Sequence, residues 1–277
     1  MILFPNCKIN LGLSILDKRP DGYHRIESVM YPVLIRDAAE VLPFSPYGKE
    51  SRNLACEFTA SGIPIPGPSS GNLCLKAWEL LKKDFPDLPA VRMHLHKSIP
   101  IGAGLGGGSS DGAIMLLMLN QQFNLNLTAN QLMDYAGRLG SDCPFFILNK
   151  PCFATGRGEQ LQPIVLDLSA YSIVLVDPRI HISTAWAFSQ VKPSEKKISV
   201  KTIIAKPVET WKNRLINDFE EPIFNVHPEL AEIKQQMYAA GAIYAAMTGS
   251  GATIAGIFPS KPEGLPGLAN HYRVMIL

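Results

Sequence analysis

A run of small residues between positions 100 and 113 constrains this chain more than any other part of its sequence. The run reads Pro100-Ile-Gly-Ala-Gly-Leu-Gly-Gly-Gly-Ser-Ser-Asp-Gly-Ala113 and leads straight into an apolar helical segment, AIMLLML. Glycine lets backbone N–H groups approach an anion without a Cβ in the way. The following helix adds unsatisfied N–H groups and the positive end of its dipole. The sequence therefore predicts a phosphate-binding loop, with Ser109, Ser110 and Asp111 as candidate N-cap residues.

Three common phosphate loops do not fit this run. Gly102, Gly104 and Gly107 match GxGxxG, but a dinucleotide fold expects its first glycine directly after the strand and an acid about 20 residues further on. Here Pro100 intervenes, and residues 124–131 contain no carboxylate. No lysine follows the glycines as a Walker loop requires, and the protein-kinase HRD and DFG motifs are absent. A flexible linker is disfavoured because an apolar helix follows at once.

Length and composition narrow the class of protein. A chain of 277 residues can bury a substantial core and form one large or two small domains. With 47% hydrophobic and 18% charged residues, it is not a disordered chain, a coiled coil or a collagen-like repeat. The net charge of +2 argues against a nucleic-acid-binding surface. Five cysteines without CxxC spacing favour reduced thiols in a cytoplasmic protein over disulfides or a zinc site.

Two segments of the sequence bear on targeting and on membrane insertion. The N-terminus has no basic region ahead of an apolar core, so no signal peptide is expected. Residues 235–260 carry no charge and are long enough to cross a membrane. They contain Gly241, Gly249, Gly251 and Gly256, however, and therefore favour a helix end, a strand, a glycine turn and a second strand. No membrane partner is expected.

The hydrophobic periodicity predicts an α+β chain with mixed sheets. Turn chemistry marks Arg19-Pro-Asp-Gly22, and residues 61–71 read as a loop. A domain boundary is expected near residues 150–158. Strands are expected at residues 9–13, 29–35, 38–42, 91–97 and 171–176 and near 153, 243, 253 and 273, and helices at 72–83, 110–122, 128–139, 228–239 and 262–270 and near 184.

The glycine loop resembles the ATP-binding motif of the GHMP kinases, the superfamily of galactokinase, homoserine kinase, mevalonate kinase and phosphomevalonate kinase. Other segments resemble the branch that phosphorylates a cytidine-diphosphate-linked methylerythritol in non-mevalonate isoprenoid synthesis. They follow in the family's order along nearly the whole chain: Asn6-Cys-Lys-Ile-Asn-Leu-Gly-Leu13, Pro20-Asp-Gly-Tyr-His24, Gly140-Ser-Asp-Cys-Pro-Phe-Phe146, Gly156-Arg-Gly-Glu159, Asn217-Asp-Phe-Glu220 and Met247-Thr-Gly-Ser-Gly-Ala252. Many relatives carry asparagine where this chain has Asp111, and the role of that carboxylate is left open.

The resemblance implies a fold and a reaction. The fold is the two-domain GHMP-kinase fold, with an N-terminal part (1–155) like domain 2 of ribosomal protein S5, a ferredoxin-like C-terminal part (156–277) and an active site in the cleft between them. The reaction transfers a phosphoryl group from ATP, with Mg²⁺, to the 2-hydroxyl of the CDP-linked alcohol. Alternatives are a sister kinase for a sugar or mevalonate-type alcohol and a catalytically silent nucleotide-binding regulator. Metal ligands and oligomeric state are left open.

Two residues match the family's catalytic pair. Asp142 corresponds to the base that takes the proton of the acceptor hydroxyl, and Lys8 corresponds to the lysine beside that base. Local chemistry alone favours a solvated strand residue for Lys8 and a turn or helix-terminus residue for Asp142. The resemblance reverses that preference, because an ammonium near a carboxylate keeps it ionised and stabilises phosphoryl charge.

The resemblance also implies binding residues. His24 is expected to hydrogen-bond the cytosine edge, Tyr23 to stack on its face and Phe188 to close the other face, with Trp186 as the alternative to Phe188. Asn72 and Lys97 match positions that border the adenine, although Asn72 fits an N-cap and Lys97 a wet strand end equally well. The ATP-binding set is Asn72, Lys97, Pro100, Ile101, Gly102, Ala103, Gly104, Leu105, Gly106, Gly107, Gly108, Ser109 and Ser110; the substrate-binding set is Asn10, Tyr23, His24, Thr184, Phe188, Gly249, Ser250 and Gly251.

Two further groups of residues have the chemistry of a metal site or of a nucleophile. His94 and His96 share a strand face with Arg92, so a metal site is possible, but a solvated polar face is favoured because no third ligand completes it. Cys143 follows Asp142 and could suggest a nucleophile. A tightly packed thiol is the simpler interpretation.

Overall fold

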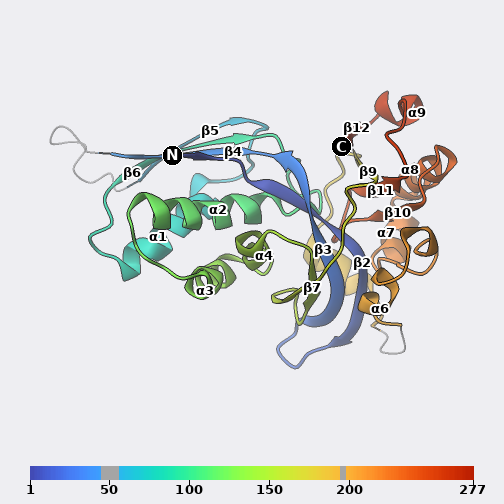
Figure 1. Ribbon diagram of the computed structural model, residues 1–277, viewed down its shortest axis with the longest axis horizontal. Helices are drawn as coiled ribbons and strands as arrows, with labels where there is room; N and C mark the ends of the chain where they lie inside the picture. Colours follow the sequence, from blue (N-terminus) through green and yellow to red (C-terminus); the bar gives the residue numbers. More distant parts are fainter. Residues whose placement is uncertain (45–55, 194–197) are drawn as a thin grey trace. The chain divides into compact units, whose positions relative to one another are not determined.

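The structure is a computed structural model that describes residues 1–44, 56–193 and 198–277 (Figure 1). The chain divides into two compact units, and each unit combines several stretches of sequence. Unit 1 comprises Met1–Cys7, Val33–Ile101 and Gly106–Asn149, and unit 2 comprises Lys8–Pro32, Gly102–Leu105 and Lys150–Leu277. These units are defined by packing. The expected domain boundary near residue 155 follows chain order and stays a prediction.

Unit 1 contains a four-stranded sheet with helices on one side. The strand order is β1 (Ile2–Leu3), β4 (Ala38–Pro43), β6 (Val91–Lys97) and β5 (Cys56–Gly62). β4 pairs antiparallel with β1 and β6, whereas β5 runs parallel to β6. The helices gathered on one side in Figure 1 are α1 (Leu73–Asp84), α2 (Gly107–Gln122), α3 (Ala129–Leu139) and α4 (Cys143–Leu148), and the short 3-10 helix η2 (Ser69–Gly71) leads into α1. The apolar helix α2 packs against β4 and the other three helices.

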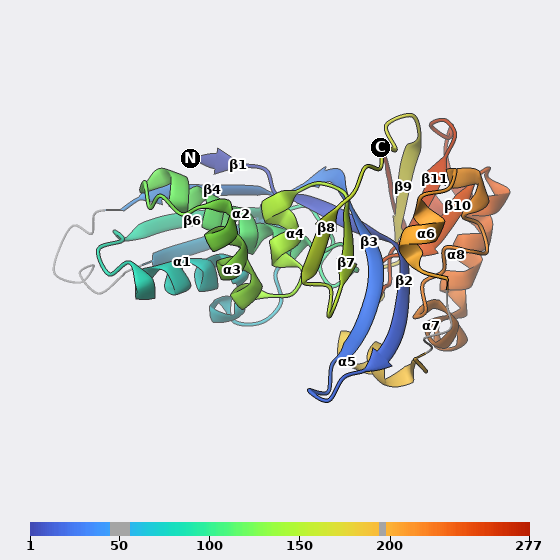
Figure 2. The ribbon, with the colours of Figure 1, turned by 60° about the horizontal axis from the view of Figure 1, so that its bottom comes forward.

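Unit 2 contains an antiparallel sheet whose order is β10 (Tyr244–Met247), β11 (Ile254–Phe258), β9 (Ser172–Asp177) and β12 (Arg273–Ile276). Its helices are α5 (Thr184–Gln190), α6 (Val200–Ile204), α7 (Glu220–Val226), α8 (Pro228–Ala239) and α9 (Pro266–Ala269), with a 3-10 helix η3 (Val208–Thr210). Figure 2 shows α8 beside β10 and β11, against which it packs. Phe219, Ile233, Met237 and Ile254 belong to the core formed there.

A third sheet has the order β2 (Asn6–Lys18), β3 (His24–Arg36), β7 (Cys152–Thr155) and β8 (Gln160–Pro163). β2 and β3 are long, curved strands (Figures 1 and 2), and most of their length belongs to unit 2. The alternation of Ile9, Leu11 and Leu13 correctly predicts a strand. The polar residues that alternate with them, Lys8 and Asn10, are buried as well. This second buried face of β2 carries part of the candidate site.

The expected mixture of helices and strands is confirmed. Strand β6 and helix α8 have the bounds that the periodicity predicts. Thr128 begins α3 with a capping box to Gln131, and Asn72 begins α1 with a side-chain cap on the N–H of Cys74. The turn at residues 19–22 joins β2 to β3 as expected.

Several expectations are corrected. Helix α2 begins at Gly107 rather than Ser110, because Gly106 is its N-cap and has a left-handed φ of 69°. Ser109, Ser110 and Asp111 all lie inside the helix, so the expectation that they serve as N-caps is wrong, and Ser110 and Asp111 are buried. Helix α9 is shorter than the expected 262–270. The hydrophobic periodicity does not predict four short elements: α4, α6, α7 and β8.

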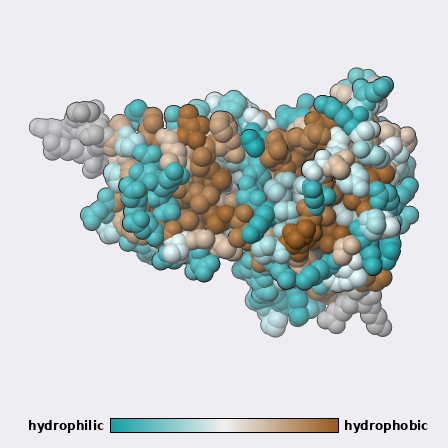
Figure 3. Space-filling model, viewed as in Figure 1, coloured by the Kyte–Doolittle hydropathy of each residue, from teal (hydrophilic) through white to brown (hydrophobic). Residues whose placement is uncertain are grey.

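The uncharged segment at residues 235–260 folds as expected from its glycines. It contains the end of α8, then β10, a turn and β11. Among the helices described by the structure, none has the length and apolar character to span a membrane. On the face shown in Figure 3, hydrophobic residues lie in separate groups among hydrophilic ones.

Candidate active site

The first half of the glycine loop, Gly102–Leu105, belongs to unit 2 and is held by its carbonyl groups. The carbonyl of Gly104 accepts hydrogen bonds from the Thr248 hydroxyl and the Lys8 ammonium, each at 3.2 Å. The carbonyl of Leu105 accepts from the backbone N–H of Lys8 at 3.0 Å. A trans peptide directs its C=O and N–H to opposite sides. The N–H of Leu105 therefore points away from Thr248 and Lys8, as an anion-binding loop requires.

Two glycine turns of unit 2 approach so closely that side chains are excluded. Gly104 has a φ of +78°, and a Cβ there would lie 2.2 Å from the carbonyl oxygen of Thr248. A Cβ on Gly249 would lie 3.2 Å from the carbonyl oxygen of Gly104. Glycine is required at position 104 for both its φ and its close contact. The loop and the turn at 248–251, which were expected as separate motifs, are thus in direct contact.

Lys8 and Asn10 lie on the buried face of β2 and share their partners with the loop. The Lys8 side chain is 3% exposed and its ammonium donates to Asn10 Oδ1 and to the carbonyl of Gly104. The backbone N–H of Asn10 donates a hydrogen bond to the Thr248 hydroxyl at 2.8 Å, and the side-chain amide of Asn10 donates one to Ser28 Oγ at 2.8 Å. The alternative that Lys8 is a solvated strand residue is therefore wrong. Thr248 was not singled out from sequence, although the quoted motif Met247-Thr-Gly-Ser-Gly-Ala252 contains it.

The second half of the loop begins α2 in unit 1. The N–H of Ser110 makes the first intrahelical bond, to the carbonyl of Gly106 at 2.9 Å. The N–H groups of Gly107, Gly108 and Ser109 therefore precede the hydrogen-bonded part of the helix. Such a helix N-terminus combines free donors with the positive end of the dipole. This geometry agrees with a phosphate cradle.

A buried charge cluster in unit 1 lies directly beside the start of α2. The Lys97 ammonium is ion-paired with Asp37 and, at 2.8 Å, with Asp111 Oδ2. Asp37 Oδ1 also accepts from the N–H groups of Ser98 and Ile99, at 2.6 and 2.9 Å. The alternative that Lys97 lies at a wet strand end is wrong, because its side chain is 3% exposed. Its ammonium joins β6, the segment before β4 and the first turns of α2.

The cluster holds two carboxylates but one ammonium. Burial raises the pKa of Asp111 to about 7, Lys97 opposes that rise and the Asp37 carboxylate adds to it. Burial alone would lower the pKa of Lys97, but the two carboxylates outweigh it and raise that pKa. Asp111 Oδ1 has no hydrogen-bond partner among the described residues. Asp111 therefore faces Lys97, which answers the question that the sequence left open about its carboxylate.

Two other predicted residues of unit 1, Asn72 and Asp142, lie at the starts of helices. Asn72 Oδ1 accepts from the N–H of Cys74 at 2.8 Å, which confirms its alternative role as an N-cap. Asp142 is half-buried and precedes α4, but its side chain makes no capping hydrogen bond.

The neighbouring Cys143 is fully buried. Burial and, to a smaller extent, the charge of Asp142 raise the pKa of its thiol to about 12, although a hydrogen bond from Ser109 opposes this rise. A thiol with so high a pKa is a packed residue and not a nucleophile.

His24 and Phe188, both predicted for base recognition, are neighbours in unit 2. Their rings stack with centroids 5.0 Å apart and an interplanar angle of 13°. The rings of Phe188 and Phe219 meet edge to face with centroids 4.9 Å apart, and both Phe188 and Trp186 pack against the core of unit 2. Burial and the charge of Lys18 lower the pKa of His24. A neutral imidazole offers one donor and one acceptor, as recognition of a base edge requires.

Other substrate candidates lie in unit 2 as well. Tyr23 is 54% exposed, and the Arg157 guanidinium lies 4.8 Å from the centroid of its ring. Arg157 was not singled out from sequence, although its segment Gly156-Arg-Gly-Glu159 was. The hydroxyls of Thr184 and Ser250 lie 3.0 Å apart, which brings these two predicted residues together.

The alternative metal site at His94 and His96 has a different explanation. His94 lies within hydrogen-bond distance of the hydroxyls of Thr59 and Ser61, and His96 of that of Ser61. Among the residues that the structure describes, no group of three or more His, Cys, Asp or Glu side chains is suited to hold a metal ion. The histidines belong to a polar ladder on β5 and β6.

Comparisons with known proteins agree with this geometry. Two family models match the chain: "GHMP kinases N terminal domain" over residues 72–150 and "GHMP kinases C terminal" over residues 206–265. The solved structure of a mevalonate kinase superposes with a TM-score of 0.74 over 100% of this chain and 98% of that one, at 13% identity. Such similarity defines the fold, which is that of the GHMP kinases.

Closer relatives define the family further. A 4-diphosphocytidyl-2-C-methyl-D-erythritol kinase of Bacteroides fragilis is 50% identical over 263 residues, which cover 95% of this chain and 93% of that one. A protein of the same name from Chlorobium limicola is 36% identical over 92% of this chain and 88% of its own length. The crystal structure of a 4-(cytidine 5'-diphospho)-2C-methyl-D-erythritol kinase superposes with a TM-score of 0.81 at 30% identity, covering 100% of this chain and 98% of that one. The chain therefore belongs to the GHMP kinases and, within them, to the 4-diphosphocytidyl-2-C-methyl-D-erythritol kinase family.

Proposed function

We propose that this protein transfers the γ-phosphoryl group of ATP to the 2-hydroxyl of 4-diphosphocytidyl-2-C-methyl-D-erythritol, giving the 2-phosphate and ADP. The observation that carries the proposal is the 50% identity to a kinase of that name over 95% of the chain. The reaction would serve the non-mevalonate synthesis of isoprenoid precursors. GHMP kinases use ATP, and the two-part glycine loop supplies N–H groups suited to its phosphates.

Asp142 and Lys8 are our candidates for the catalytic pair. Phosphoryl transfer needs a positioned hydroxyl, a group that accepts its proton and positive charge that stabilises the transition state. In the proposed mechanism, Asp142 accepts the hydroxyl proton. Lys8, whose ammonium is held by the carbonyl of Gly104 and by Asn10, stabilises the transferring phosphoryl group. These hydrogen bonds fix the Lys8 ammonium before substrate binds.

Magnesium would enter with the nucleotide. Mg²⁺ keeps several water ligands and is commonly held by substrate phosphates with one or two carboxylates, so a kinase needs no preformed cage. We therefore write the donor substrate as MgATP and name no protein ligand for the ion. Five cysteines without CxxC spacing fit a reducing compartment, and we propose a cytoplasmic location. The two family-model matches lie on either side of residue 155, which supports our proposed domains 1–155 and 156–277.

We propose that the His24 and Phe188 pair recognises the cytosine. Aromatic stacking provides affinity for any base, whereas hydrogen bonds to the base edge select one. The stacked rings, 5.0 Å apart, place a neutral imidazole beside an aromatic face. Tyr23, backed by Arg157, is the proposed second aromatic face. Asn10, Thr184, Gly249, Ser250 and Gly251 complete the proposed substrate set.

The test is ADP formation from MgATP with three alcohols: the cytidine-diphosphate compound, the same alcohol without its cytidine group, and mevalonate. We expect turnover with the first alone. The Asp142→Asn variant should bind ATP normally and lose at least about 10²-fold in turnover, the usual contribution of a general base. Turnover on mevalonate, or ATP binding without turnover on any of the three alcohols, would contradict the proposed function.

A further inference from the structure

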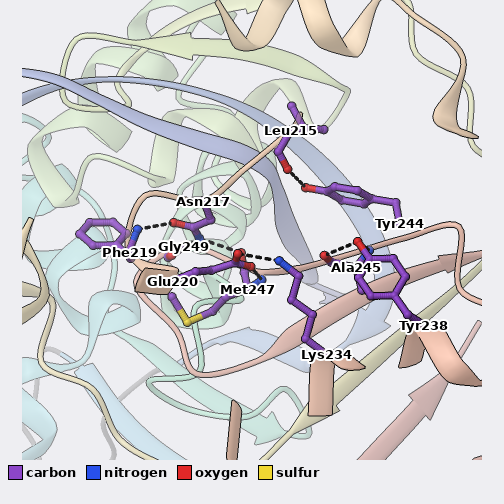
Figure 4. A network of polar contacts seen from close by, with 10 residues as sticks. All are labelled: Leu215, Asn217, Phe219, Glu220, Lys234, Tyr238, Tyr244, Ala245, Met247 and Gly249. Carbon is purple, nitrogen blue, oxygen red and sulfur yellow. Dashed lines mark hydrogen bonds and ion pairs between the residues drawn. The ribbon is translucent and has the colours of Figure 1, made fainter. Parts of the chain in front are cut away.

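A network of buried polar side chains in unit 2 surrounds the turn between β10 and β11 (Figure 4). Asn217 precedes α7, is 1% exposed and lies close to this turn. Its amide nitrogen donates to the carbonyl of Met247 at 2.7 Å and to the carbonyl of Gly249 at 2.8 Å. Its amide oxygen accepts from the N–H of Phe219 at 3.0 Å. One side chain therefore ties both ends of the Met247–Gly249 segment to the start of α7.

Glu220 fixes the same segment from another side. Its carboxylate is buried and accepts from the N–H of Met247 at 2.7 Å with one oxygen. The other oxygen accepts from the Lys234 ammonium at 2.7 Å, which compensates the charge. Asn217 and Glu220 together bind the N–H and the carbonyl of Met247. The backbone on this side of the turn is therefore restrained by the side chains of Asn217, which precedes α7, and of Glu220, which begins α7.

The restrained segment carries Thr248, whose hydroxyl is the link to the phosphate loop. Thr248 is fully buried, and its hydroxyl donates to the carbonyl of Gly104 and accepts from the N–H of Asn10. The carbonyl of Gly104 also accepts from the Lys8 ammonium. A continuous path of hydrogen bonds thus runs from Asn217, through the turn, to the groups that hold the loop and Lys8.

We propose that Asn217 is a positioning residue for phosphoryl transfer: by holding the carbonyls of Met247 and Gly249, it places the Thr248 hydroxyl that fixes Gly104 and Lys8. Asn217 does not touch the reacting atoms and acts through Thr248. The proposal rests on the proposed function for its kinetic readout. ATP binding gives a second readout that does not depend on the acceptor alcohol.

The Asn217→Asp variant separates this role from simple capping of α7. Aspartate has the same shape and keeps an oxygen for the N–H of Phe219, but it loses both donations to the turn. At neutral pH it would instead place a carboxylate against two carbonyl oxygens. When that carboxylate is protonated, its O–H can again donate to one carbonyl. The ratio of variant to wild-type activity should therefore rise as the pH falls.

Tyr244→Phe is the matched control. The Tyr244 hydroxyl is buried in the same network and donates to the carbonyl of Leu215 at 3.0 Å, but it does not contact the turn (Figure 4). Each variant removes buried hydrogen bonds, so each should lower the free energy of unfolding. The two proteins are compared by urea unfolding, by titration with ATP and by steady-state kinetics.

We expect Asn217→Asp to lower kcat/KM for ATP at least tenfold and to weaken ATP binding, with Tyr244→Phe within twofold of wild type. Burial against two carbonyl oxygens disfavours the charged form and raises the pKa of the new carboxyl well above the ordinary aspartate value. We therefore expect the defect of Asn217→Asp to shrink severalfold between about pH 8 and about pH 6. Equal defects in both variants, or a defect without pH recovery, would overturn the proposal. If Asn217→Asp does not fold, Asn217→Ser, which retains one donor, is compared with Tyr244→Phe in the same way. If wild-type protein binds ATP but phosphorylates none of the alcohols, the proposed function fails, whereas the binding comparison still decides the role of Asn217.

Discussion

The two halves of one glycine loop are held by different kinds of interaction. In unit 1 the start of α2 lies against a buried cluster of full charges, in which Lys97 is paired with Asp37 and Asp111. In unit 2 the carbonyl of Gly104 accepts hydrogen bonds from the Thr248 hydroxyl and the Lys8 ammonium. The absence of a side chain at Gly104 lets the loop contact the turn at residues 248–251. The half of the loop in unit 1 therefore depends on charge balance, and the half in unit 2 depends on shape and hydrogen bonding.

The difference has physical consequences. Removing one partner of a buried ion pair leaves an uncompensated charge in a medium of low dielectric constant, which typically costs about 3–5 kcal/mol. A backbone contact made possible by glycine does not titrate, but it tolerates no additional atom. We therefore expect the unit 1 half to respond to charge and pH, and the unit 2 half to respond to side-chain size.

Replacement of Lys97 by methionine should have the largest effect. The variant keeps the length of the side chain but leaves Asp37 and Asp111 buried without their ammonium. We expect the free energy of unfolding to fall by about 3–5 kcal/mol at neutral pH. Urea unfolding followed by circular dichroism measures this loss. A loss below about 1 kcal/mol, the range of an exposed ion pair, would show that the cluster does not hold this half of the loop.

A pair of glycine variants tests the other half. In Gly104→Ala the new Cβ would lie 2.2 Å from the carbonyl oxygen of Thr248 at a φ of +78°, so both the turn and the loop must shift. We expect a loss of about 2–4 kcal/mol in unfolding free energy, from strain and overpacking together.

Gly108→Ala is the control for this pair. Gly108 lies within α2, and a Cβ there meets nothing within 4 Å. Since alanine favours helix by about 1 kcal/mol over glycine, this variant should be neutral or slightly more stable. Thermal unfolding measures the comparison: the midpoint should fall in Gly104→Ala and should stay at or above the wild-type value in Gly108→Ala. Similar losses in both would contradict the steric account.

The smallest expected effect concerns pH. The pKa of Asp111 rises from an ordinary value of 3.8 to about 7 on folding, so the folded protein binds more protons within that range. Stability therefore falls as the pH rises through this window. Asp111→Asn cannot titrate, so the free energy of unfolding of wild type relative to this variant should fall by about 2–3 kcal/mol between about pH 5 and about pH 8, since one pKa unit corresponds to about 1.4 kcal/mol. Unfolding curves at both pH values measure it. Parallel pH profiles for the two proteins would rule out Asp111 as the titrating group.

Local sequence signals predicted the pieces of this loop well. Glycines before an apolar segment predicted that a helix begins there, and alternation predicted β6 and the strand that carries Lys8. The family resemblance pointed to His24 and Phe188, whose rings prove to be stacked. Each of these inferences depends on residues that are near in sequence or on motifs of several residues.

Features that depend on distant packing were not predictable in this way. Lys97 ends a strand, where sequence suggests solvent, and it becomes buried because Asp37 and Asp111 from other elements meet it. Thr248 is one hydroxyl among many in the sequence, and its role depends on a contact with Gly104, which lies 144 residues away. The N-cap of α2 was misplaced because a left-handed glycine, Gly106, replaced the expected polar cap.

The burial of Cys143 makes it a natural reporter of opening in unit 1. Alkylating reagents attack the thiolate, which burial suppresses by raising the pKa to about 12, and they need physical access to the sulfur. Modification in the native protein should therefore wait for a transient opening around α4. The labelling rate of this cysteine would then measure how often the segment next to Asp142 opens, without any engineered probe.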